Sequence, residues 1–91
     1  MATFQTTVTV TTASAEVLPP NPRRLSALLI NDDAANVIYL SKLAPAVANQ
    51  GIRINSVGGS YEITAVNHYT GRLYAICSAG TPKLLISEDS A

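Results

Sequence analysis

His68 and Cys77, each the only residue of its type, are the best candidates in this chain for acid–base or nucleophilic chemistry. A Ser-His-Asp or Cys-His arrangement would need His68, but His68 lies in a polar stretch, residues 67–71, that is typical of an exposed loop. Cys77 alternates with Leu73 and Ala75, as a small buried hydrophobic residue does. No neighbouring residue is suited to activating its thiol. We therefore expect no catalytic residues and no enzyme.

Metal and phosphate sites are not indicated either. Asp32 and Asp33 could bind calcium, but the oxygen-rich loop of about twelve residues that calcium motifs use is absent, so we expect them to cap a turn. Gly58 and Gly59 lack the lysine and the strand-to-helix setting of a phosphate loop. A single cysteine can form neither an internal disulfide nor a structural zinc site, which needs about four ligands. No cofactor is expected.

Residues 3–12 could bind a partner through one face of a strand. Thr, Val and Phe alternate there, with Phe4, Val8 and Val10 on one side and uncharged polar residues on the other. Residues 1–12 are therefore a possible edge strand of the chain's own sheet or an intersubunit arm that adds to a neighbour's sheet. Phe4, Val8 and Val10 are the partner-binding candidates of this segment.

Arg23 and Arg24 are the other partner-binding candidates. They follow a cluster of prolines, Pro19, Pro20 and Pro22, which must interrupt any sheet because proline lacks a backbone donor. Two interpretations of the arginines are possible. In the first their charges are solvated at a strand end, and in the second they contact an acidic patch on a partner.

Further alternating segments predict the strands that must position these residues. They are residues 15–18, 23–31, 37–40, 52–54, 61–63, 73–77 and 84–86. About eight short antiparallel strands at such spacings predict an all-β fold, either a small β-sandwich or a jelly-roll-like barrel. A chain of 91 residues has room for a single domain, which we place at residues 1–91.

The connections can also be predicted. Residues 31–36 are rich in turn formers, so residues 23–41 are interpreted as a β-hairpin. Residues 52–63, with two glycines at the turn, are interpreted as a second hairpin. Residues 42–50 could form one or two helical turns, with Pro45 near the start. The acidic residues after 86 are expected to fray.

Charge restricts the partners further. Six basic residues balance six acidic ones, so the chain has no positive field with which to bind nucleic acid. Charged residues make up 13% of the chain, against about 25% in an average soluble domain, which indicates that part of the surface contacts another protein. No secretory signal and no run of about eighteen apolar residues is visible, so we expect synthesis in the cytoplasm and no membrane partner.

Several runs between Val17 and Glu88 resemble small β-sandwich proteins encoded among the virion genes of tailed bacteriophages. The runs are strand cores and turns: Asn21-Pro22-Arg23-Arg24-Leu25, Ile30-Asn31, Val37-Ile38-Tyr39-Leu40-Ser41, Gln50-Gly51-Ile52-Arg53-Ile54, Gly58-Gly59-Ser60-Tyr61-Glu62-Ile63, Tyr69-Thr70-Gly71, Tyr74-Ala75-Ile76 and Gly80-Thr81. The resemblance carries over no catalytic residue.

The resemblance implies a structural component of the virion, most simply a capsid decoration (cement) protein that binds and stabilises the head. Its partner would be the major capsid protein or another virion protein, and its oligomer a homotrimer, because such proteins often occupy symmetric positions of a shell. The alternative is a tail- or fibre-associated module that recognises a host receptor or a carbohydrate. Sugar sites usually display aromatic faces, and this chain has no tryptophan and one phenylalanine, which favours the decoration protein.

Overall fold

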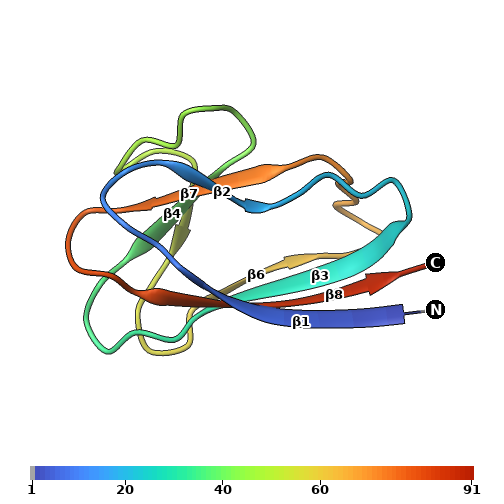
Figure 1. The fold of residues 1–91 in the computed structure, drawn as a ribbon, viewed down its shortest axis with the longest axis horizontal. Coiled ribbons are helices and arrows are strands. Elements are labelled where there is room, and N and C mark those ends of the chain that lie inside the picture. The colour runs from blue at the N-terminus through green and yellow to red at the C-terminus, as the bar shows by residue number, and fades with distance from the viewer. Residues whose placement is uncertain (1) are drawn as a thin grey trace.

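The alternating segments form eight β-strands, which pack as two four-stranded sheets with every neighbouring pair antiparallel (Figure 1). The computed structural model describes residues 2–91, and no helix occurs among them. In spatial order, the first sheet contains β1 (Ala2–Thr9), β8 (Lys83–Ser90), β3 (Arg24–Asn31) and β6 (Ser60–Ile63). The second sheet contains β2 (Ala15–Leu18), β7 (Leu73–Cys77), β4 (Ile38–Ser41) and β5 (Ile52–Ile54).

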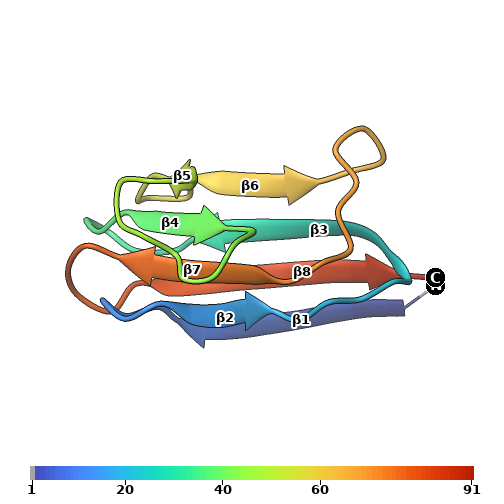
Figure 2. The same cartoon turned by 90° about the horizontal axis from the view of Figure 1, so that it is seen from above.

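The strand order is that of a jelly roll. Strands 1, 8, 3 and 6 lie in one sheet and strands 2, 7, 4 and 5 in the other, so the chain crosses between sheets at every connection except the one from β4 to β5. Two interlocking Greek keys of this kind define the eight-stranded jelly roll. Seen from above, β1 and β2 lie at one lateral edge of the sandwich and β5 and β6 at the opposite edge (Figure 2). The predicted all-β sandwich is confirmed.

The core lies between the sheets, where the inward-facing residue of each strand is apolar. Alternate residues of a strand point to opposite faces of its sheet. The residues of one face are therefore buried against the other sheet, and the residues of the other face point outward. The side chains with no exposed surface include Leu29, Ile38, Leu40, Ile63, Leu73 and Leu84.

Both predicted hairpins are wrong. β3 belongs to the first sheet and β4 to the second, and β5 and β6 are divided in the same way. The turn after β3 folds inward because Asn31 is fully buried and its side-chain amide donates to the carbonyls of Asn36 (2.8 Å) and Ile54 (3.1 Å). Turn-forming residues mark where a strand ends, but such buried contacts decide which sheet the chain enters next.

The helical turn predicted for residues 42–50 is absent, and the segment forms an irregular loop. Ala46 is buried, and its N–H donates to Ser14 Oγ (2.8 Å), in the connection between β1 and β2. Asn49 has a φ of 66°, which lies in the left-handed region and does not continue a helix. A single turn has too few internal hydrogen bonds to compete with these tertiary contacts.

The acidic end of the chain does not fray. Glu88 and Asp89 lie within β8, which is held between β1 and β3. Asp89 accepts hydrogen bonds from the hydroxyls of Thr3 (2.7 Å) and Ser26 (3.2 Å) on these two neighbours. Because each carboxylate finds a partner on an adjacent strand, the expectation drawn from charge alone is wrong.

Candidate interaction surface

The residues with possible catalytic chemistry lie apart in the fold. His68 is in the exposed loop between β6 and β7, as predicted, and its Nε2 lies 2.6 Å from the carbonyl oxygen of Arg24. Cys77 is on β7, with 1% of its surface exposed. Among residues 2–91, no group of three or more histidine, cysteine, aspartate and glutamate side chains could hold a metal ion. Within the same residues, no helix is long and apolar enough to cross a membrane.

Asp33 caps a turn, as predicted. Its Oδ2 accepts the backbone N–H groups of Ala35 (3.0 Å) and Asn36 (2.7 Å) in the connection between β3 and β4. These two hydrogen bonds to the charged carboxylate lower the pKa of Asp33. The stability that the cap contributes is therefore present at neutral pH and is lost when the pH falls through this lowered pKa.

Cys77 packs in the core as a protonated thiol. Its Sγ lies 3.4 Å from the carbonyl oxygen of Gly80 and 3.8 Å from that of Val10. Burial raises the pKa of the thiol, so little thiolate is present at neutral pH.

We expect Cys77→Ala to lower the free energy of unfolding by about 1 kcal/mol, the scale for loss of a small buried group. Denaturant unfolding measures this change. We also expect the native thiol to react with a disulfide reagent only as fast as the chain unfolds. Rapid reaction of the folded protein would contradict the packing role.

β1 pairs within its own sheet along its whole length, from Ala2 opposite Ser90 to Thr9 opposite Lys83. Of the two alternatives for residues 1–12, the structure has the edge strand at Ala2–Thr9; residues 10–12 follow it outside any strand, and Met1 lies outside the described residues. The three apolar candidates differ in their surroundings. Val10 is buried in the core and Val8 packs against it, whereas Phe4 is 60% exposed. Val10 cannot contact a partner, so that assignment is wrong.

Arg24 also cannot contact a partner, because only 1% of its surface is exposed. Its Nε donates to Glu88 Oε2 in a buried ion pair. Its other guanidinium nitrogens donate to three backbone carbonyls, those of Tyr69 (3.0 Å), Gly71 (3.0 Å) and Pro19 (2.6 Å). Arg24 thus joins β3, β8 and two loops at one end of the sandwich. Of the arginine pair, Arg23 alone is exposed.

A β-bulge explains why the sequence pattern misplaced Arg24. The pairing of β3 with β8 shifts register between Arg24 and Ser26. The extra residue turns Leu25 outward, where it is 45% exposed, and turns Arg24 toward the core. Strict alternation would have put Leu25 on the core face with Ala27 and Leu29. Glu88, the partner of Arg24, lies 64 positions along the chain, and nothing in the sequence pattern distinguishes it from the other acidic residues.

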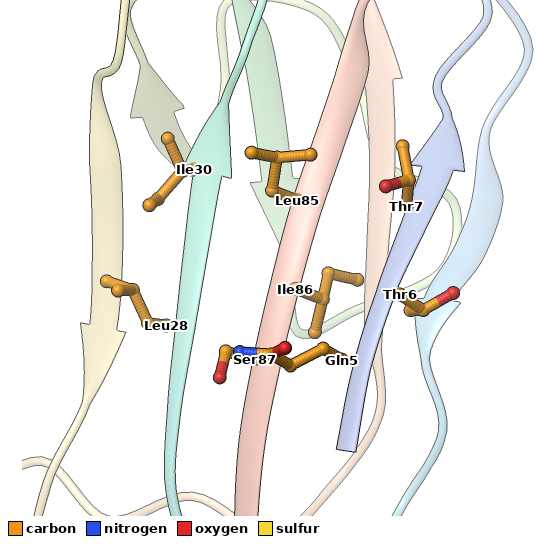
Figure 3. A pocket seen from close by; sticks show the side chains of 8 residues that line it. All are labelled: Gln5, Thr6, Thr7, Leu28, Ile30, Leu85, Ile86 and Ser87. Atoms are coloured by element: carbon orange, nitrogen blue, oxygen red, sulfur yellow. The ribbon is translucent and has the colours of Figure 1, made fainter. Parts of the chain in front are cut away.

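The outer face of the first sheet holds a feature that the sequence did not indicate, an open pocket of about 500 Å³ across β1, β8 and β3. We call it the sheet hollow. In Figure 3, Leu28 and Ile30 approach it from β3, and Leu85 stands between them and β1. The lining consists of Gln5, Thr6, Thr7, Leu28, Ile30, Leu85, Ile86 and Ser87.

The chemistry of the sheet hollow suits a protein surface. None of its lining residues is charged or aromatic, and Leu28, Ile30 and Leu85 remain partly exposed beside hydroxyl and amide groups. On β3, Leu28 and Ile30 alternate with the core residues Ala27 and Leu29, and they are only partly buried because no other sheet covers this face. A mixed apolar and uncharged polar lining binds by shape and burial, with few groups to orient a charged or reactive ligand.

Comparison of the chain with protein-family models, with curated proteins and with solved structures finds no match.

Proposed function

We propose that this chain is a structural component of a tailed-phage virion, a decoration protein that attaches to the head through the sheet hollow. The single observation that carries the proposal is the uncharged, partly apolar lining of the hollow on the outer face of the first sheet. Such a surface gains affinity from burial, at about 25 cal/mol per Å² of apolar area, and does not repel a protein partner of either charge.

Two further observations support the proposal. The jelly-roll strand order is an architecture that viral capsid domains use, and the resemblance of the strand cores to virion proteins points the same way. A fold hosts many functions, so the topology alone does not identify the role of this chain, and the chemistry of the sheet hollow carries more weight. The partner would be the major capsid protein or another protein of the particle.

The alternative role, a fibre-associated module that binds carbohydrate, has less support at this surface. Lectins also use the jelly roll. The sheet hollow, however, contains no aromatic side chain on which a sugar could stack, and Tyr61 on the neighbouring strand β6 packs against the core. A protein partner therefore fits the hollow better than a sugar.

We expect Ile30→Glu to weaken binding to heads by about tenfold or more, because a charge in the interface would be desolvated on docking. The matched control is Val66→Glu, since Val66 is 98% exposed in the loop between β6 and β7, away from the sheet hollow. Co-sedimentation with heads that lack the protein gives the affinity, and circular dichroism verifies that both variants fold.

Two results would contradict the proposal. The first is a wild-type protein that fails to sediment with heads but binds tails or a glycan array, which would favour the fibre-associated module. The second is an Ile30→Glu variant that binds heads as tightly as Val66→Glu, which would exclude the sheet hollow as the attachment surface.

A further inference from the structure

We propose that two copies of this chain pair antiparallel through the free edges of β1, with Thr6 on the two-fold axis, and so join their first sheets into one continuous sheet. The proposal concerns contacts between copies. It does not depend on what the sheet hollow binds.

β1 is the one edge strand of the described fold that is built for pairing. The other three edges are β6, β2 and β5, which have four, four and three residues, and they carry Glu62, Glu16 and Arg53 respectively. Short length and charge are the usual means by which a sheet edge resists association. β1 has eight residues and no charge, and it lies at the lateral edge of the sandwich (Figure 2).

The backbone of β1 presents a regular row of free groups at this edge. The N–H of Val10 donates to the carbonyl of Pro82 (2.9 Å), so the residues in phase with Val10 point their backbone groups toward β8. Backbone groups alternate in direction along an antiparallel strand. The N–H and C=O groups of Thr3, Gln5, Thr7 and Thr9 therefore point away from β8, toward the open side.

The side chains of β1 are self-complementary about Thr6. In an antiparallel pair with Thr6 opposite Thr6, Thr3 lies opposite the partner's Thr9, and Gln5 lies opposite the partner's Thr7. These four residues are the ones whose free backbone groups point outward, so the pairing lets those groups hydrogen-bond to one another. Phe4 then lies opposite the partner's Val8 on the inner side. That pair is not hydrogen-bonded, so its side chains approach closely. The exposed Phe4 is thereby covered by a side chain that is itself only partly buried.

The charges beside β1 favour the antiparallel direction. Lys83 Nζ donates to the hydroxyl of Thr9 (2.6 Å), and Asp89 accepts from the hydroxyl of Thr3 (2.7 Å), so opposite charges flank the two ends of the strand. Antiparallel pairing brings the acidic end of one copy to the basic end of the other. Parallel pairing would bring like charges together.

The pairing predicts a two-fold dimer. An antiparallel contact between identical strands is isologous, so it closes after two copies and cannot by itself build the homotrimer that the resemblance implies. Light scattering after size-exclusion chromatography, at loading concentrations up to about 1 mM, measures the mass. We expect a concentration-dependent dimer. A monomer throughout this range, or a trimer, would overturn the proposal.

A cysteine scan tests the register. With Thr6 on the axis, Thr6→Cys places two thiols on directly opposite residues, within the roughly 4.4–6.8 Å between Cα atoms that a disulfide requires. In Thr7→Cys the two cysteines are diagonal neighbours, about 7–8 Å apart, and lie beyond this range. With oxidised glutathione as the oxidant, we expect a covalent dimer from Thr6→Cys and at least about a tenfold lower yield from Thr7→Cys. The buried Cys77 is common to both variants. Equal yields would contradict the register.

A surface variant tests the contribution of Phe4 without disturbing the core. We expect Phe4→Glu to raise the dissociation constant of the dimer by about tenfold or more, because the new carboxylate would be buried against the partner's Val8. The control is Val57→Glu, at an exposed residue in the turn between β5 and β6 on the opposite lateral edge. A dimer that is as tight with Phe4→Glu as with Val57→Glu would overturn the proposal.

Discussion

Replacing Arg24 with methionine is expected to lower the free energy of unfolding by about 3–5 kcal/mol, the usual result of leaving one member of a buried ion pair without its partner. Glu88 would keep its place between the sheets, and three backbone carbonyls would lose their donor. Domains of this size are stable by only about 5–15 kcal/mol, so the loss is a large share of the total. Urea unfolding followed by circular dichroism measures it.

The neighbouring arginine provides the control. Arg23 is exposed, so Arg23→Met is expected to change the free energy of unfolding by less than about 0.5 kcal/mol. Glu88→Leu combined with Arg24→Met removes the unpaired carboxylate and is expected to restore part of the loss. If Arg24→Met were as stable as Arg23→Met, the ion pair would not hold this end of the sandwich together.

Deletion of residues 2–11 is expected to give a chain that does not fold. β1 covers one side of β8 along all of its eight residues, and Val10 is part of the core. Burial of a side chain such as Val10 contributes roughly 1.5–3 kcal/mol, and the lost strand pairing adds to this. The sum approaches the whole stability of a small domain.

Circular dichroism and one-dimensional NMR distinguish the outcomes of this deletion. The matched control removes residues 2 and 3 alone, which are exposed at the start of β1, and should leave a folded protein. A chain without residues 2–11 that still melts cooperatively near the wild-type temperature would mean that β1 is a detachable arm, and not a structural strand.

The strands could be predicted from the sequence because alternation is a local property. The segment at residues 3–12 has one apolar face, and the segment at residues 73–77 has two. In both, the pleat of the strand fixes which residues share a face. The pairing of strands could not be predicted. It depends on contacts that the local pattern does not show, such as those of the Asn31 amide with the carbonyls of Asn36 and Ile54. The same types of turn residue occur in a hairpin and in a connection that crosses between sheets.

The residues of the candidate interaction surface could also be predicted only in part. Of the partner-binding candidates drawn from the sequence, Phe4 and Arg23 are exposed, whereas Arg24 is buried. One extra residue at a bulge reverses the faces of β3 before Ser26, and no periodic pattern reports it. The sheet hollow was missed for a different reason. Leu28 and Ile30 are as apolar as core residues, and only the three-dimensional arrangement leaves them on an uncovered face.

Mass spectrometry of heads and tails, separated from purified particles of the phage that we propose encodes this chain, would locate the protein on the particle. We expect the protein to be recovered with the heads, in many copies per head. We also expect heads stripped of the protein to rebind the wild-type protein but not Ile30→Glu. Recovery with the tails alone, or absence from purified particles, would contradict the proposed attachment to the head.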